Sequence, residues 1–135
     1  MLREFTSGDQ ASVRELVLEG MRERWGAAYD PAFNSDLDDI VGNYVDHGAD
    51  VVVIEIEGEV VATGMLLPDA DGTGRIVRMA VGGERRRQGL GRLVVEELVR
   101  PGARSMSEVR VHTDAPWTSA VELYLSAGFV NLSPP

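Results

Sequence analysis

The sequence predicts a mixed α/β fold, with a mainly antiparallel sheet flanked by helices in the order β-α-α-β-β-β-α-β-α-β. Three observations lead to this prediction. Apolar residues recur at helical spacing over residues 13–25, β-branched residues dominate residues 51–56, and a strand-helix-strand pattern occupies residues 75–113. Strands joined by hairpins should pair antiparallel, and the two strands around a helix should be parallel with a right-handed crossover.

The N-terminal part is expected to hold a short strand and two helices. Phe5 ends the strand, and Ser7 caps the first helix with Gln10 as its capping-box partner. The apolar face of this helix recurs at spacings of three and four: Val13, Leu16, Val17, Met21 and Trp25. A second, weaker helix is expected over residues 36–47, and Gly48 closes it.

Three strands are expected in the middle of the chain. Residues 51–56 are β-branched and start the first of them. Residues 57–59 form a hairpin turn, and residues 60–67 return as the second strand. After a loop rich in Gly and Asp over residues 68–74, residues 75–81 form the third strand.

A further helix is expected over residues 89–100, where the apolar residues share one face: Leu90, Leu93, Val94 and Leu98. Pro101 and Gly102 end this helix. Residues 108–113 then alternate between apolar and polar side chains, as in a strand. These elements complete the strand-helix-strand unit.

The C-terminal part is expected to hold one helix and one short strand. Ser119 and Glu122 form a second capping box that opens the helix. Gly128 suits the position just after its end, where a left-handed backbone is common. Residues 129–130 then start a last strand, which is short because the sequence ends at Pro135.

The composition fits a single domain over residues 1–135, with 44% apolar and 26% charged residues. No apolar run is long enough for a membrane span, and residues 1–5 lack the apolar stretch of a signal peptide. Cytoplasmic residence is therefore expected. The absence of Cys excludes disulfides and thiol nucleophiles. A net charge of −9 argues against nucleic-acid binding, because that binding neutralises phosphates.

The positive charge is concentrated in one place. The 13 basic residues are all Arg, and four of them fall close together: Arg85, Arg86, Arg87 and Arg92. This cluster indicates either a local anion site or a solvated surface loop, and charge alone leaves both open. Its position between a strand and a helix favours the anion site, because a helix N-terminus exposes unpaired N–H groups. Gly89 and Gly91 let an anion approach the backbone without a Cβ in the way.

The pattern of this turn excludes two common phosphate sites. The P-loop pattern requires a Lys, and the sequence contains none. The dinucleotide pattern G-x-G-x-x-G fails because Val94 stands where its last Gly would be. Nucleotide hydrolysis and hydride transfer therefore lose their usual sequence support.

The turn does resemble the coenzyme A loop of the GCN5-related N-acetyltransferases, the GNAT family. The family pattern [Q/R]-x-x-G-x-[G/A] is matched by Arg86-Arg87-Gln88-Gly89-Leu90-Gly91. The strand Arg78-Met79-Ala80-Val81 precedes it, as in the family. Further along, residues 120–129 resemble the family's A-x-x-L-Y-x-x-x-G-F segment. The resemblance covers roughly residues 50–130, and the earlier residues fit only in element order.

The resemblance implies a function and a set of site residues. It implies transfer of an acetyl group from acetyl-CoA to a primary amine of a small molecule or protein, by direct attack and without a metal or covalent enzyme intermediate. Tyr124 would protonate the leaving thiolate. The residues that would bind the cofactor lie on the strand and in the turn: Met79, Ala80, Val81, Arg86, Arg87, Gln88, Gly89, Leu90, Gly91 and Arg92. Backbone groups of Met79 and Val81 would pair with the pantetheine arm, and the turn would hold the pyrophosphate.

Several assignments stay open at this point. The candidates for the general base are Glu55, Glu57, His112 and Asp114, or a water relayed from one of them, and each of these residues also has a simple structural explanation. Trp25 and Tyr29 line the acceptor pocket or simply pack in the core. The acidic residues 36–39 attract a cationic acceptor or form an ordinary helix start.

Two departures from the family pattern stand out. Trp117 occupies a position where the family often has Asn, and the strand that usually follows the last one is missing. An exposed sheet edge invites pairing, so a homodimer is a hypothesis. Two alternative functions remain: a non-catalytic acyl-CoA binding or sensing domain of the same fold, and a structural protein whose Arg cluster binds another anion.

Overall fold

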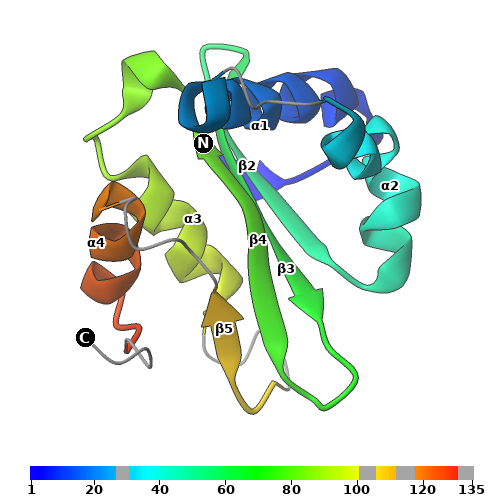
Figure 1. Ribbon diagram of the computed structural model, residues 1–135, viewed down its shortest axis with the longest axis vertical. Helices are drawn as coiled ribbons and strands as arrows, with labels where there is room; N and C mark the ends of the chain where they lie inside the picture. The colour runs from blue at the N-terminus through cyan, green and yellow to red at the C-terminus, as the bar shows by residue number, and fades with distance from the viewer. Residues whose placement is uncertain (27–30, 101–105, 112–117, 131–135) are drawn as a thin grey trace.

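The computed structural model describes residues 1–26, 31–100, 106–111 and 118–130 (Figure 1). Its centre is a five-stranded sheet in the order β1-β2-β3-β4-β5. The strands are β1 Leu2–Glu4, β2 Asp50–Ile56, β3 Glu59–Pro68, β4 Gly74–Val81 and β5 Val109–Val111. Neighbouring strands from β1 to β4 pair antiparallel, whereas β4 and β5 pair parallel. The predicted mixed, mainly antiparallel sheet is therefore confirmed.

Helices cover both faces of the sheet. The α-helices are α1 Gln10–Trp25, α2 Ile40–Asn43, α3 Leu90–Leu98 and α4 Thr118–Ser126. Short 3-10 helices are η1 Ser7–Asp9, η3 Pro31–Asp38, η4 Val45–His47 and η5 Gly83–Arg85. Figure 1 shows α1 and α2 on one side of the sheet and α3 and α4 on the other. None of the helices in the described ranges has the length and apolarity to cross a membrane.

Each face of the sheet has its own apolar core. In β2, Val52 and Ile54 face the core that α3 and α4 cover, whereas Val51 and Val53 face the core that α1 and α2 cover. Side chains alternate between faces along a strand, so a strand covered on both sides must be apolar throughout. This is why β2 reads as a continuous β-branched run.

The start of the first helix differs from the prediction. Thr6, not Ser7, stands before the first turn, where its N–H donates to the Asp9 carboxylate at 2.9 Å. Gln10 has a different task from capping: its side chain donates to the Leu37 carbonyl at 2.6 Å and accepts from the Ile40 N–H at 2.9 Å. Gln10 thereby connects α1 to α2. Capping preferences are local, so they do not predict this contact between residues far apart in the chain.

The predicted helix over residues 36–47 is wrong as one unit. The chain forms η3, α2 and η4 in succession, and the backbone of Asn34 is non-helical inside η3. Asp39 interrupts the helix because its side chain accepts from the Gly42 N–H at 2.9 Å, which is an N-cap. Gly48 does end the segment, with a left-handed φ of +88°.

Two residues predicted on buried helix faces are exposed. Leu93 is 49% exposed, because it lies on the side of α3 away from the buried residues Leu90, Val94 and Leu98. Val95, which the prediction omitted, is buried instead. Trp25 is 48% exposed, because it ends α1 beyond Leu18, the last buried residue of that helix.

The C-terminal elements are partly as predicted. Helix α4 starts at Thr118, so Ser119 lies inside the helix and not at its cap. Gly128 ends the helix with a φ of +99°, as expected. Residues 129–130 do not form the predicted strand, because the Phe129 N–H bonds to the Tyr124 carbonyl at 3.0 Å and stays with α4. Residues 131–135 lie outside the described residues.

Candidate active site

Strand β4 contains a bulge at Arg78. Thr63 of β3 pairs with Ala80, and Met65 pairs with Val77, so two β4 residues stand opposite the single Gly64. Arg78 is the inserted residue, with a left-handed φ of +55°. Such a φ is strained for a residue with a side chain and costs about 1–2 kcal/mol. The bulge therefore requires support from the surrounding structure.

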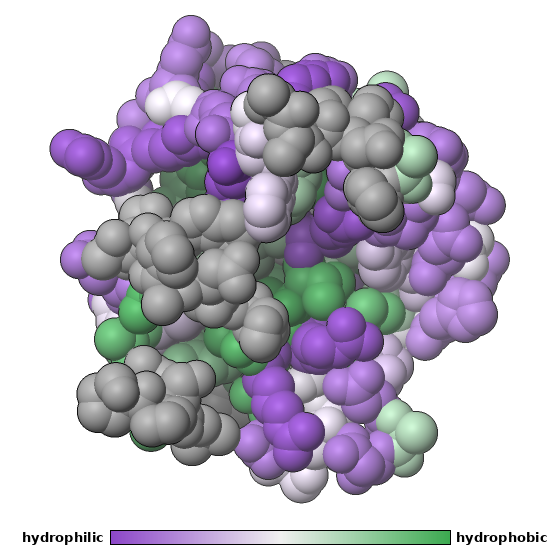
Figure 2. Space-filling model, in the orientation of Figure 1, coloured by the Kyte–Doolittle hydropathy of each residue, from purple (hydrophilic) through white to green (hydrophobic). Residues whose placement is uncertain are grey.

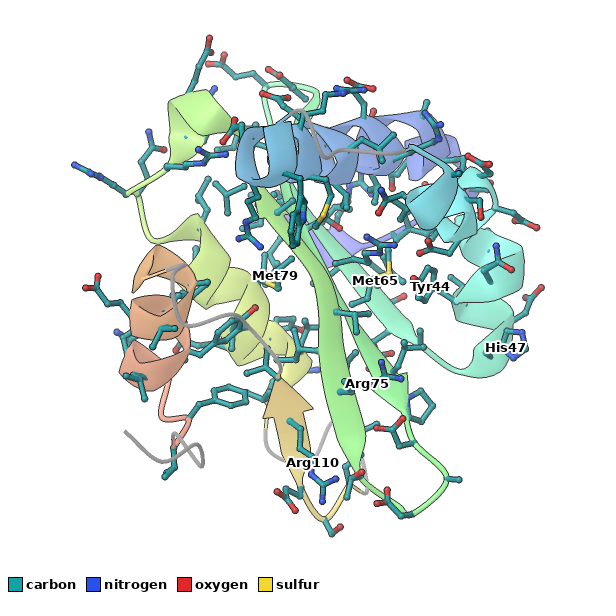
Figure 3. The ribbon with its side chains drawn as sticks, in the orientation of Figure 1. Tyr44, His47, Met65, Arg75, Met79 and Arg110 are labelled. Carbon is teal, nitrogen blue, oxygen red and sulfur yellow. The ribbon has the colours of Figure 1, made fainter. Side chains whose placement is uncertain are left out.

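The bulge decides which way the following side chains point. Met79 and Val81 pack in the core of α3 and α4, whereas Val77 and Ala80 pack in the core of α1 and α2. In Figure 3, Met79 lies on the α3 side of β4, and Met65 and Tyr44 lie on the α2 side. Gly64 is needed for this arrangement, since a Cβ there would lie 2.7 Å from Val94 Cγ1 and closer still to the Met79 sulfur.

Strands β4 and β5 separate after a short paired stretch. Only Gly74, Arg75 and Ile76 of β4 pair with β5, so residues 77–81 have no described partner strand on that edge. All five of these residues are half-buried. The space-filling view shows apolar surface over the middle of β4 and beside α3 and α4 (Figure 2). The edge on which the sequence puts Met79, Ala80 and Val81 is therefore open within the described part of the chain.

The turn after β4 leads to an uncapped helix. Gly89 is the N-cap of α3 with a φ of +79°, and no side chain caps the helix. The first N–H within the helix to find a partner is that of Leu93, which donates to the Gly89 carbonyl at 3.1 Å. Among the described residues, none accepts from the N–H groups of Leu90, Gly91 and Arg92. Free N–H groups at the positive end of a helix dipole are the kind of donors that bind anions.

The two glycines of the turn have different reasons to be glycine. A Cβ on Gly89 would meet nothing within 4 Å, so this residue opens onto free space. A Cβ on Gly91 would lie 3.2 Å from Leu123 Cδ2, because α3 and α4 pack closely there. Gly89 therefore leaves free space at the start of α3, while Gly91 also allows the close packing of the two helices, and the anion path stays a prediction for both.

The side chains of the turn are exposed and partly paired. Arg86 Nη2 lies 2.6 Å from Glu23 Oε2 of α1, and Arg86 Nε lies 3.4 Å from the Val81 carbonyl oxygen. Arg92 pairs with Glu96 within α3 at 3.4 Å. Arg87 has a left-handed φ of +65°, and Gln88 is exposed. The backbone donors of the turn are therefore fixed, whereas its guanidinium groups lie at the surface.

Tyr124 lies on α4 and is buried in the core that this helix forms with α3 and the sheet. It is 8% exposed, and its ring meets Phe129 edge-on at a centroid distance of 5.7 Å. Burial raises the pKa of Tyr124 to about 12, and the positive charge of Arg24 opposes this rise only weakly. The phenol therefore keeps its proton throughout the neutral and mildly alkaline range.

Two of the four candidates for the general base, Glu55 and Glu57, lie among the described residues. Glu55 accepts from Arg3 at 2.6 Å near the β1 edge of the sheet, two strands away from β4. Glu57 lies in the exposed hairpin turn with a φ of +52°. Neither is near the open β4 edge. His112 and Asp114 lie outside the described residues, as do Tyr29 and Trp117.

The acidic residues 36–39 each have a structural partner. Asp38 pairs with Arg14 at 2.9 Å, and Asp39 caps α2. Asp36 accepts from Arg78 Nη2 at 2.7 Å and also from the Tyr44 hydroxyl, whose pKa is raised by burial and by this carboxylate. These contacts favour the interpretation of Asp39 as a residue that starts a helix. They indicate that Asp36 and Asp38 support the fold.

The sequence reading missed Arg78. Its guanidinium joins β4 to Asp36 and to Asn34 Oδ1, which lies 2.8 Å from Nη1. A signal was present, because Arg78 is the only charged residue between Ile76 and Val81 in an otherwise apolar strand. A charge in a strand covered on both faces requires a buried partner.

This geometry is that of a known family. The family model described as "Acetyltransferase (GNAT) family" matches residues 11–129. The chain belongs to the GNAT family. Acetyl-CoA is the acyl donor of this family, as the sequence predicted. No curated protein sequence matches the chain.

Solved GNAT structures share the fold at low sequence identity. A GNAT acetyltransferase from Staphylococcus aureus superposes with a TM-score of 0.88 at 18% identity, covering 98% of this chain and 85% of that one. Glucosamine-6-phosphate N-acetyltransferase from Arabidopsis thaliana gives 0.71 at 22%, covering 100% and 94%. AAC(6')-Iy, solved with the bisubstrate analogue CoA-S-monomethyl-acetylneamine, gives 0.76 at 15%, covering 100% and 93%.

Proposed function

We propose that this protein is an N-acetyltransferase, which transfers the acetyl group of acetyl-CoA to a primary amine. The observation that carries the proposal is the open β4 edge over residues 77–81, which leads directly to the uncapped N-terminus of α3. An extended ligand with an anionic end fits such an edge and helix start. Membership of the GNAT family supports acetyl-CoA as that ligand.

The residues of the site fit the parts of acetyl-CoA. The N–H groups of Leu90, Gly91 and Arg92 would bind the pyrophosphate, with Gly89 leaving the approach free. Residues 86–88 would add backbone donors and positive charge around it. The backbone of Met79, Ala80 and Val81 would pair with the pantetheine arm as an added strand. Binding there would replace the weak contact from Arg86 to the Val81 carbonyl.

Acetyl-CoA supplies an acyl carbon on a thiolate leaving group. The amine nitrogen would form a bond to that carbon while the carbon–sulfur bond breaks; the nitrogen would lose a proton to solvent and the sulfur would take one up. Tyr124 would donate this proton or hydrogen-bond to the sulfur. With a pKa of about 12, Tyr124 is a weaker acid than an ordinary phenol. We infer that its donation occurs only as negative charge develops on the sulfur, so that its role is largely that of a hydrogen-bond donor.

The variant Tyr124→Phe tests this role. It should lower kcat about tenfold and leave the affinity for acetyl-CoA nearly unchanged, because the ring and its contact with Phe129 are kept. The Tyr124 phenol does not ionise below about pH 10 when its pKa is about 12. Any fall in wild-type kcat between pH 8 and pH 10 should therefore persist in the variant. Equal kcat in both proteins would exclude the role.

The names of the structural neighbours suggest which acceptor amines to test first. The neighbours include glucosamine-6-phosphate N-acetyltransferase and the ribosomal-protein-alanine N-acetyltransferase from Brucella melitensis. Release of free thiol should therefore be measured with glucosamine-6-phosphate, neamine and a peptide with an N-terminal alanine. Thermal stabilisation by acetyl-CoA well above that by pyrophosphate, with thiol release for one amine, would support the proposal.

The second candidate is an acyl-CoA binding or sensing domain. The observation that favours it is that Glu55 pairs with Arg3 on β2 and Glu57 lies in the β2–β3 hairpin turn, so neither of the two described candidates supports a role as general base at the β4 edge. Stabilisation by acetyl-CoA without thiol release for any amine would favour this candidate. Equal stabilisation by acetyl-CoA and pyrophosphate would contradict both.

A further inference from the structure

Arg78 is an unusual residue for its position. It is the inserted residue of the β4 bulge and has a φ of +55°, which residues with side chains rarely adopt. Its side chain is only 17% exposed. Strained backbone of this kind persists where the surroundings fix it, and it is concentrated at functional sites. The surroundings of Arg78 therefore matter for the whole end of β4.

Those surroundings come from the other side of the molecule. The Arg78 guanidinium forks onto Asp36, with Nη2 at 2.7 Å from Oδ1 and Nε at 3.2 Å from Oδ2. Its Nη1 donates to Asn34 Oδ1 at 2.8 Å. Asp36 and Asn34 both belong to η3, which precedes α2. A two-pronged contact between Arg and a carboxylate fixes orientation as well as distance.

Tyr44 extends this contact to the end of α2. Its hydroxyl donates to Asp36 Oδ2, the same oxygen that accepts from Arg78 Nε. Tyr44 is buried in the α1 and α2 core, and Figure 3 shows it on the α2 side of β4. Arg78, Asp36, Asn34 and Tyr44 thus form one polar group, which we call the Arg78 cluster. It joins residues 34–44 to the β4 bulge.

The bulge is directly followed by the proposed cofactor strand. Met79 comes next in the chain, and its side-chain direction depends on the inserted Arg78. We propose that Arg78 is a positioning residue that couples occupancy of the β4 edge by coenzyme A to the order of residues 34–44. The inference rests on the proposed function, because it takes coenzyme A as the ligand of that edge.

The coupling follows from a shared backbone conformation. A ligand strand that pairs with Met79 and Val81 favours the backbone in which the bulge is formed. That backbone places the guanidinium on Asp36, and so stabilises residues 34–44. The reverse also holds, because coupling between two sites is reciprocal. The segment that covers the sheet beside the cofactor strand would thus become ordered when the cofactor binds.

Hydrogen exchange on the full chain measures this coupling without knowledge of the acceptor. Amide exchange is followed with and without saturating coenzyme A. In the wild-type protein, exchange should slow at residues 86–93, which report binding at the helix start. It should also slow about fivefold at residues 40–44, which the ligand does not touch. The first change reports the proposed function, and the second reports the coupling.

Three variants disrupt the Arg78 cluster, and each removes a different group from it. Arg78→Met removes the guanidinium, Asp36→Asn removes the negative charge, and Tyr44→Phe removes one hydroxyl with little change of shape. Each should keep the slowing at residues 86–93 and reduce that at residues 40–44 to less than about twofold. Arg78→Lys should retain an intermediate coupling, because it keeps the charge and loses the fork. Tyr44→Phe and Asp36→Asn keep the test valid if Arg78→Met does not fold.

Arg75→Met is the matched control. Arg75 lies on the same strand, is exposed, and makes a single long contact of 3.4 Å with Asp69 (Figure 3). This variant should show the full wild-type coupling. Slowing at residues 86–93 alone in the wild-type protein, or undiminished coupling in the cluster variants, would overturn the inference and leave the proposed function standing. No slowing at residues 86–93 would remove the proposed function and the inference with it.

Discussion

The two sides of the molecule are each stabilised by a different kind of interaction. The β4–α3 side, residues 59–98, relies on backbone geometry and apolar packing: a bulge, left-handed residues and the buried Leu90, Val94 and Leu98. The α1–α2 side, residues 1–48, relies heavily on polar contacts between distant residues. The first side exposes backbone donors at the start of α3, whereas the second engages several of its charged side chains in ion pairs between distant residues.

The polar contacts of the α1–α2 side form a series. Arg3 bridges Asp9 and Glu55, Gln10 bridges Leu37 and Ile40, and Arg14 reaches Asp38. The Arg78 cluster then connects this side to β4. Apart from it, Arg86 and Glu23 also link the two sides, at the surface.

This difference explains why sequence patterns predicted the β4–α3 side better than the α1–α2 side. Binding by backbone N–H groups requires only that the chain adopt a given shape, so a few glycines and a helix start suffice. That requirement leaves a short local pattern. Contacts between distant side chains leave no such pattern, because each partner alone looks like an ordinary surface charge.

Gly89→Val should have the largest effect. A branched side chain at a φ of +79° is strained and would point into the free space before α3. The affinity for acetyl-CoA should fall at least about 100-fold, or about 2.7 kcal/mol, as measured by calorimetry.

Gly72→Val is the matched control for that variant. Gly72 has a φ of +83° and also has nothing within 4 Å, but it lies in the loop between β3 and β4. It should lose similar stability and keep its affinity. An equal loss of affinity in both variants would show that strain, and not the anion path, causes the effect.

Gly64→Ala should disturb the β4–α3 side by packing alone. The added Cβ would overlap Met79 and lie 2.7 Å from Val94 Cγ1. Overpacking of this kind costs about 1–3 kcal/mol in urea unfolding. Gly20→Ala in α1, where a Cβ meets nothing within 4 Å, should instead be neutral or stabilising. Equal stability of Gly64→Ala and wild type would mean that the bulge is free to shift.

Asp9→Asn should reveal a pH dependence on the α1–α2 side. Hydrogen bonds from Arg3 lower the pKa of Asp9 to about 2. A lowered pKa means that the stabilisation is complete above the unfolded value of 3.8 and is lost as the pH falls through 2. The wild-type protein should therefore lose about 1 kcal/mol between pH 4 and pH 2 that the variant does not lose. Parallel stability curves for the two proteins would contradict this.

Arg14→Ala should have the smallest effect. Arg14 and Asp38 pair at 2.9 Å, but their side chains are 40% and 61% exposed. Exposed pairs contribute about 0.5 kcal/mol or less to the free energy of unfolding. A loss well above 1 kcal/mol in urea unfolding would show that the polar contacts of this side act together and not one by one.

Features that depend on residues close together in the sequence were predicted well. Features that depend on contacts between distant residues were predicted poorly. The five strands of the sheet and the turn between β4 and α3 were predicted correctly because each rests on a local pattern. The packing reason for Gly91 was not predicted, because its neighbour Leu123 comes from another helix. The helix over residues 36–47 failed because Asp39 caps α2 inside it. Leu93 was placed in the core by its spacing, although it lies on the outer side of α3.

Local sequence patterns correctly predicted the order of the five strands, the mixed sheet and the glycine-containing turn that precedes α3. Periodicity records which faces are buried, and turn residues record backbone shape, so both can be read locally. The contact of Arg78 with Asp36, which lies 42 positions away in the chain, and the direction of Met79 toward α3 are visible only in the folded structure. The physical reason is that one inserted residue reverses the side-chain alternation of a strand, and a buried charge finds its partner only when the chain has folded.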